Sequence, residues 1–231
     1  MSATGGPCPY PPPEPGRNRR PLPVPAAGAR AQPPAPFRRL SRTRRKPGDS
    51  PSPGALTSAG MTPSFERPPL LADERTALIG WLDLQRRILR WKCDGLSEAD
   101  AHRAVVPTSP AMTMAGLIGH MRWVEHTWLE VLFLGGDKTR NPAFDETDED
   151  ADWRTDGTPL KQLLAEYEAQ CARSNEIVAA ASLDDVGRHP DYRSGNANLR
   201  WMLIHLVEET GRHAGHADIV RELLDGTKGY Y

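Results

Sequence analysis

Apolar residues recur at intervals of three and four along most of the second part of the chain, and this spacing is typical of amphipathic helices. Four segments carry the pattern, at about residues 72–93, 113–134, 158–181 and 198–224. No stretch shows the alternating β-branched residues of a strand. The sequence therefore predicts an all-α fold, a four-helix bundle.

Residues that favour helix ends bound these segments. Glycines suited to the left-handed C-terminal position follow three of them, at Gly95, Gly135 and Gly226. Expected N-caps are Ser109 or Thr113 for the second segment, Thr158 before Pro159 for the third, and Asn196 or Asn198 for the fourth. Between the helices, residues 137–157 form an acidic, turn-rich connection and residues 183–195 a second loop.

The composition divides the chain at about residue 60. Residues 1–60 contain 15 of the 23 prolines and carry a formal charge of +8, whereas residues 61–231 carry −9. A segment so rich in proline cannot bury enough apolar surface to offset the conformational entropy that a chain loses when it becomes ordered. We therefore expect residues 1–60 to be a disordered Pro/Arg-rich extension and residues 61–231 to form a folded domain. The extension either functions as a basic arm or has no function of its own.

Several classes of protein are excluded by composition. No apolar run approaches the roughly 20 residues that a membrane-spanning helix needs, and no apolar leader segment follows Met1. The acidic charge of residues 61–231 argues against nucleic-acid binding by the folded domain. Three widely spaced cysteines, Cys8, Cys93 and Cys171, imply neither a disulfide framework nor a cysteine zinc site. A reducing, cytoplasmic location is the simplest interpretation.

Polar residues interrupt two of the apolar stripes. The inward face of the last helix is expected to contain Met202, Leu206, Glu209, His213, Ala217, Val220 and Leu224, so that a carboxylate and an imidazole occupy its centre. The second helix has His120 in the stripe Leu117, His120, Val124, Trp128 and Val131. Burying such groups without partners would cost several kcal/mol, on the order of 2–7. We therefore expect these three side chains to share one site.

Two imidazoles and one carboxylate are a ligand set for a divalent metal with an open coordination position. Zinc is the preferred metal, and nickel or iron would also suit these donors. The competing interpretation is a buried Glu209–His213 ion pair beside a core histidine. His205 and His216 share a helix face and either replace one ligand or lie outside the ligand set. Trp123 and Trp128, close to His120, are candidates for the wall of an apolar pocket.

Residues from about 72 to 227 resemble the DinB/YfiT-like superfamily of metal-binding four-helix bundles. The segments that carry the resemblance are Asp73–Leu78, Leu117–Met121 and Asn198–Asp218. Many members have His-x-x-x-His on the last helix, whereas this chain has Glu209 at the first of these positions. That departure is similar to the mycothiol-dependent maleylpyruvate isomerase branch, whose metal is held by His, Glu and His. The resemblance implies His120, Glu209 and His213 as ligands.

The resemblance also implies an activity, namely transfer or isomerisation with mycothiol or a similar thiol, with a metal-bound thiolate as nucleophile. The partners would then be a small thiol and an electrophile. We expect no membrane and no nucleic acid bound by the folded domain, and a homodimer is left open. The alternative is a non-catalytic metal-binding bundle of stress-response type that acts through a partner or as a dimer. Arg122, Arg200 and Arg212 are candidates for binding a carboxylate of such a thiol, or else surface charges.

Overall fold

The computed structural model describes residues 65–190 and 193–229, which are mainly helical. The long elements are α1 (Glu74–Trp91), α3 (Met114–Glu125) with its continuation η1 (His126–Phe133), α4 (Leu160–Ala180) and α5 (Leu199–Asp225). No strand forms in these residues, although Val186 and Asn198 make an isolated β-bridge. The predicted all-α four-helix bundle is confirmed, whereas the extension predicted at 1–60 lies outside the described residues.

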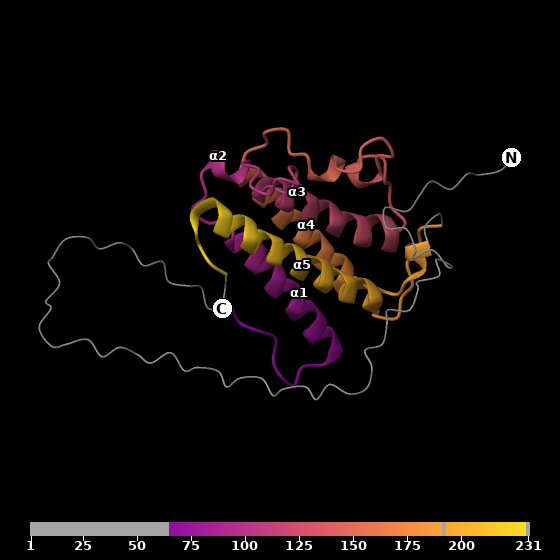
Figure 1. Cartoon of the computed structure of the whole chain (residues 1–231). Helices are drawn as coiled ribbons and strands as arrows, with labels where there is room; N and C mark the ends of the chain where they lie inside the picture. Colours follow the sequence, from indigo (N-terminus) through magenta and orange to yellow (C-terminus); the bar gives the residue numbers. More distant parts are fainter. Residues whose placement is uncertain (1–64, 191–192, 230–231) are drawn as a thin grey trace, which may run out of the picture. The chain divides into compact units, whose positions relative to one another are not determined.

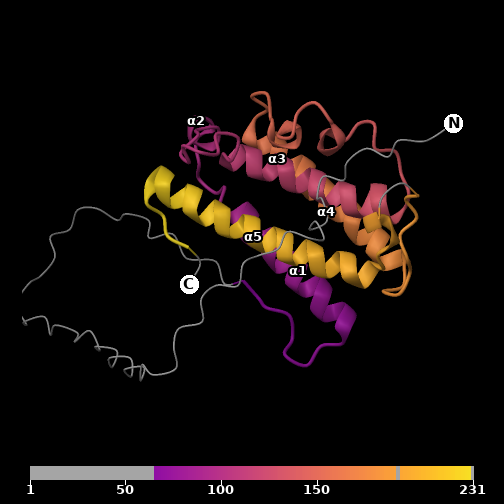
Figure 2. The ribbon, with the colours of Figure 1, turned by 45° about the vertical axis from the view of Figure 1, so that its right-hand side comes forward.

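The long helices form two packed pairs, and the contact between α3 and α5 joins the pairs. Helix α5 contacts α1 along its length and also contacts α3, while α3 contacts α4. Figures 1 and 2 show α1 and α5 side by side in both views. The core between the helices is apolar and includes the fully buried Leu89, Leu117 and Leu203. The contact between α3 and α5 is the one that matters for the site, because the two apolar stripes that polar residues interrupt lie on these helices.

Most predicted helix ends are confirmed. The side chains of Thr113 and Asn198, two of the expected N-caps, each accept a hydrogen bond from a backbone N–H in the first turn that follows. Asp73, which was not among the expected N-caps, does the same for α1. Gly226 ends α5 with φ of 77° in the left-handed region. These caps resolve the alternatives left by the sequence, and they fix the phase of α3 and α5.

The start of α4 differs from the prediction that Thr158 is its cap. The helix begins at Leu160, and Pro159 occupies the N-cap position without a side-chain hydrogen bond. The Leu160 N–H instead donates to the carboxylate of Glu98, at 2.9 Å. Glu98 belongs to α2 (Glu98–Ala101), a short helix more than 60 residues earlier. A distant carboxylate thus satisfies a donor that a local hydroxyl was expected to bind.

The second helix is not α-helical throughout. At His126 it changes to the wider π-helix, and Leu134 donates its N–H to the carbonyl of Leu129, five residues earlier. Gly135 then ends the element with φ of 73°. Hydrophobic periodicity predicted one continuous helix over 113–134, and its extent is correct although the last part has π geometry.

The segment between η1 and α4 lies along α3 (Figures 1 and 2). It contains two short 3-10 turns, η2 (Pro142–Phe144) and η3 (Ala151–Trp153), and η3 packs on α3. A third 3-10 turn, η4 (Arg193–Asn196), precedes α5. Within the described residues, no helix combines the length and apolar character needed to span a membrane.

Candidate metal centre

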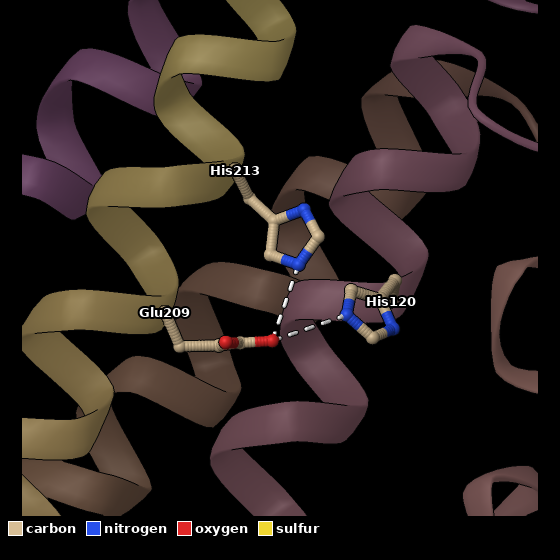
Figure 3. A group of neighbouring side chains, drawn as sticks. All are labelled: His120, Glu209 and His213. Carbon is tan, nitrogen blue, oxygen red and sulfur yellow. Dashed lines mark hydrogen bonds and ion pairs between the residues drawn. The ribbon is translucent and has the colours of Figure 1, made fainter. Parts of the chain in front are cut away.

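His120, Glu209 and His213 meet between α3 and α5, as the polar interruptions of the two stripes predicted. His120 extends from α3, the other two extend from α5, and all three point toward one another (Figure 3). They are 5%, 2% and 6% exposed, respectively. One ligand atom from each lies within 4.8 Å of the others. The three side chains therefore form one buried cluster.

The geometry of the cluster centres on one carboxylate oxygen. Glu209 Oε1 lies 3.2 Å from His213 Nε2 and 4.0 Å from His120 Nε2. The first distance follows from the i, i+4 spacing on α5, which places both side chains on the same face. The second depends on the packing of α3 against α5 and has no counterpart in local sequence. The bundle thus adds one imidazole to a pair that the helix already provides.

Neighbouring groups shift the pKa values of Glu209 and His120 in opposite directions. Burial raises the pKa of Glu209, but the neighbouring imidazoles of His120 and His213, together with the charge of His205, outweigh burial and hold the pKa well below its usual range. Burial lowers the pKa of His120, but Asp152 and Glu209 outweigh burial and raise it. Glu209 is accordingly an ionised carboxylate at neutral pH.

The donor atoms fit a divalent cation. His120 Nε2 is buried and has no hydrogen-bond partner among the described residues, and 4.0 Å to Glu209 is too long for a hydrogen bond. Zinc binds such nitrogen and oxygen atoms at about 2.0–2.2 Å in a tetrahedral arrangement, which places neighbouring ligand atoms roughly 3.4 Å apart. The observed 3.2 Å and 4.0 Å separations are close to this spacing, so the residues present fit a metal.

A cavity of about 370 Å³ adjoins the cluster. Its lining includes the apolar and aromatic side chains of Val124, Trp128 and Trp153. It also includes the polar residues Glu149, Arg212 and His216. The Arg212 side chain is 53% exposed, so the cavity reaches the surface of the bundle. The cluster therefore faces a space large enough for a small molecule.

Asp152 and Trp153, which sequence reasoning missed, also belong to the site. Asp152 Oδ2 lies 2.6 Å from His120 Nδ1, and Trp153 lines the cavity. Both residues are on η3, in the segment that the sequence predicted only as an acidic connection. Their neighbours Asp148, Glu149 and Asp150 are just as acidic, so composition gave no signal that singles out Asp152.

Two glycines allow η3 to approach α3 closely. A Cβ on Gly116 would lie 2.2 Å from the Ala111 carbonyl oxygen and 3.2 Å from that of Trp153. A Cβ on Gly119 would lie 3.2 Å from Thr155 Cγ2. The absence of side chains at these positions brings the backbone of η3 onto the helix one turn from His120. Small residues on α3 were the available signal for this contact.

A family model described as mycothiol-S-transferase matches residues 77–226, about two thirds of the chain. The chain belongs to the mycothiol-S-transferase family. The match confirms the resemblance to DinB-like bundles. A His-Glu-His group is also present, as the resemblance implied. No curated protein and no solved structure matched the chain.

In this mycothiol-S-transferase family member, the remaining histidines of α5 lie beside the cluster. His216 Nδ1 is 3.3 Å from His213 Nδ1. His205 packs against Trp128 and Trp201, and its Nδ1 lies 3.8 Å from a Glu208 carboxylate oxygen. One possible ligand atom from each of His205, Glu208 and Glu209 also lies within 4.8 Å of the others, but this group includes an exposed glutamate and a half-buried histidine.

The tryptophan and arginine candidates have different positions in this family member. Trp128 lines the cavity, whereas Trp123 packs against His126 and Arg122. Arg122 pairs with Glu166, and Arg200 pairs with Glu74 and Asp184. Arg212 contacts Glu208 and Glu209 and also lines the cavity. Of the three arginines, Arg212 is the one whose position suits recognition of a molecule in the cavity.

Neither of the described cysteines, Cys93 and Cys171, is among the residues that line the cavity. Burial is the main cause that raises the pKa of the Cys93 thiol and that of the Cys171 thiol to about 12. A thiol with such a pKa carries little thiolate at neutral pH and is a poor nucleophile. Cys93 is buried and Cys171 is half-buried, so neither is placed or activated for this chemistry, and Cys8 lies outside the described residues.

Proposed function

We propose that the chain is a divalent-metal-dependent transferase that joins the sulfur of mycothiol, or of a similar low-molecular-weight thiol, to an electrophile. The observation that supports this proposal is the buried His120, Glu209 and His213 cluster facing an open cavity. The family relates the chain to mycothiol transferases in general, and the reaction type, S-transfer or isomerisation, is the finer proposal.

His120, Glu209 and His213 are proposed to hold the metal. A bound divalent cation supplies positive charge that lowers the pKa of a coordinating thiol. The two imidazoles offer neutral Nε2 lone pairs, and the ionised Glu209 compensates part of the positive charge. Zinc is our preferred metal because imidazole and carboxylate donors suit it, and nickel or iron remain alternatives with the same donors.

The cavity walls are proposed to select the two substrates. Trp128, Trp153 and Val124 offer an apolar surface that excludes water and suits a carbon electrophile. Arg212 offers a partly exposed guanidinium that can bind an acidic or hydroxyl-rich part of the thiol. In the S-transfer reaction, the thiol proton passes to solvent, the sulfur lone pair forms a bond to carbon, and the leaving group departs with its bonding electrons.

The open cavity favours an enzyme over a non-catalytic metal-binding bundle. A structural metal is closed by protein ligands on all sides, whereas here three candidate ligands adjoin a space of about 370 Å³. With mycothiol as cosubstrate, we propose a cytoplasmic reaction, because that compartment keeps thiols reduced.

The test is spectroscopy of cobalt-substituted protein followed by a conjugation assay. Addition of mycothiol should produce a sulfur-to-cobalt charge-transfer band, and mycothiol with a chlorinated bimane should give the thioether and chloride. The His213→Ala variant should show neither change and serves as the control. If wild-type protein binds cobalt and no small thiol perturbs its spectrum, the transferase proposal fails and a metal-binding module replaces it.

A further inference from the structure

The connecting segment places a second carboxylate against the candidate metal centre. Asp152, on η3, is 7% exposed, and its Oδ2 lies 2.6 Å from His120 Nδ1. The two residues are 32 positions apart, so this contact is tertiary. Asp152 contacts Nδ1 of the His120 ring, whereas Glu209 lies nearest the other ring nitrogen, Nε2.

The contact defines which nitrogen of His120 carries the proton. A carboxylate can only accept a hydrogen bond, so Nδ1 is the donor. In the neutral ring, Nε2 then has a free lone pair, and that is the atom directed at the cluster. Trp153 stacks on the same ring with centroids 4.0 Å apart and planes 11° apart, which limits rotation of the ring out of its plane.

The second imidazole has a different partner. His213 Nδ1 lies 3.3 Å from Nδ1 of His216, so its partner there is another imidazole and no carboxylate. Of the two imidazoles in the cluster, His120 therefore has a carboxylate at Nδ1, that of Asp152. Histidines that bind a metal commonly donate their other ring N–H to a carboxylate in this way. A negatively charged acceptor at Nδ1 increases the electron density available at Nε2.

We propose that Asp152 is a positioning residue for the metal centre, which acts through His120 by holding its ring in the Nδ1–H tautomer with Nε2 aimed at the metal. The inference rests on the proposed function in so far as that function requires a metal at His120, Glu209 and His213. It adds a residue outside the ligand set and makes the acidic connection between η1 and α4 part of the site.

The test is zinc affinity, measured by competition with a chromophoric chelator for wild-type protein and three variants. Asp152→Ala should weaken zinc binding about 10–100-fold. Asp152→Asn should lose less, because the amide oxygen still accepts from Nδ1. The matched control is Asp148→Ala, because Asp148 is on the same segment but pairs with the exposed Arg154. Its affinity should stay within twofold of wild type.

Thermal unfolding of the metal-free proteins separates positioning from general support of the fold. A residue that only supports the fold would lower the unfolding midpoint in Asp152→Ala and leave zinc affinity unchanged, and that result overturns the proposal. If Asp152→Ala does not fold, Asp152→Asn and ring ¹⁵N NMR of zinc-loaded wild-type protein decide. The His120 signals should show a protonated Nδ1, and a protonated Nε2 overturns the proposal.

Failure of this inference is distinguishable from failure of the proposed function. Tight zinc binding by wild type that is unchanged in Asp152→Ala removes the role of Asp152 and leaves the transferase proposal intact. Loss of affinity in Asp152→Ala, with no response of the cobalt protein to any thiol, leaves Asp152 in its role and removes the transferase. No zinc binding by wild type overturns both.

Discussion

The indole of Trp153 lies flat against the imidazole of His120, with ring centroids 4.0 Å apart and planes 11° apart. The same indole lies 5.3 Å from the His213 ring, at an angle of 64°. One residue of the connecting segment thus contacts both imidazoles of the cluster. The segment between η1 and α4 is therefore a wall of the site as well as a connection between helices.

Removal of either histidine should remove most of the metal. In His120→Ala and in His213→Ala, two of the three candidate ligands remain, which is too few to retain a divalent ion through gel filtration. Elemental analysis of purified protein checks this, with His102→Ala as a control outside the cluster. Near-full occupancy in both cluster variants would contradict the assignment and direct attention to His205 and His216.

Gly116→Ala and Gly215→Ala should have opposite effects on stability. A Cβ at Gly116 meets the Ala111 carbonyl oxygen at 2.2 Å, so we expect a loss of about 1–3 kcal/mol from overpacking. Gly215 lies in α5 with no atom within 4 Å of its added Cβ, so alanine should gain about 0.5–1 kcal/mol of helix propensity.

Urea denaturation of the two glycine variants measures both free energies of unfolding. Because Gly116 faces η3, its variant should also bind zinc more weakly than wild type, whereas Gly215→Ala should not. An equal or higher free energy of unfolding in Gly116→Ala would show that the backbone at Ala111 and η3 can both move away from α3 without cost.

Glu125→Ala should destabilise the bundle strongly. Arg86 donates to Glu125 through two nitrogens, at 2.7 Å and 2.6 Å, and the residues are 3% and 0% exposed. The variant leaves a buried guanidinium without its main counter-charge, which costs about 3–5 kcal/mol. Glu168→Ala is the comparison, because Glu168 pairs with Arg90 near the surface and should contribute at most about 1 kcal/mol.

Equilibrium unfolding in guanidinium chloride checks both ion-pair variants. Similar losses in Glu125→Ala and Glu168→Ala would show that the buried pair is compensated by its other neighbours. These include Asp83 and Asn175, which accept hydrogen bonds from Arg86 at 2.9 Å and 2.8 Å.

Residues 61–231 should fold without the segment that precedes them. Every periodic apolar position of the sequence lies after residue 61, and the proline-rich segment offers little apolar surface to bury. Deletion of residues 1–60 should therefore change the thermal midpoint by no more than a few degrees, equivalent to about 1 kcal/mol. A larger fall would show that this segment packs on the bundle, and metal content provides a second comparison of the two proteins.

The bundle and the three cluster residues were accessible from sequence because helices have a local period. Spacing of three and four residues placed Glu209 and His213 on one face of α5 and His120 on one face of α3. A polar side chain on a buried stripe needs a partner, so two such stripes predicted a common site. The caps Thr113 and Asn198 were also local, because each accepts from a backbone N–H three residues later.

Other features depended on contacts that no local pattern describes. Packing brings the Glu98 carboxylate to the Leu160 N–H, from which it accepts a hydrogen bond. Packing also places Arg212, and neither Arg122 nor Arg200, in the lining of the cavity. The change to π geometry at His126 also follows no periodic signal, because buried apolar residues fill α and π turns alike.

The sequence by itself determined the long helices, the caps of α3 and α5, and the helix faces that carry His120, Glu209 and His213, since these follow from hydrogen bonds and side-chain directions within a few residues. Only the tertiary structure decided that Asp152 meets His120 Nδ1 and that Trp153 covers the ring. The physical reason is steric: η3 can approach α3 only where Gly116 and Gly119 leave room. Which acidic residue of a loop reaches that gap depends on the whole path of the chain.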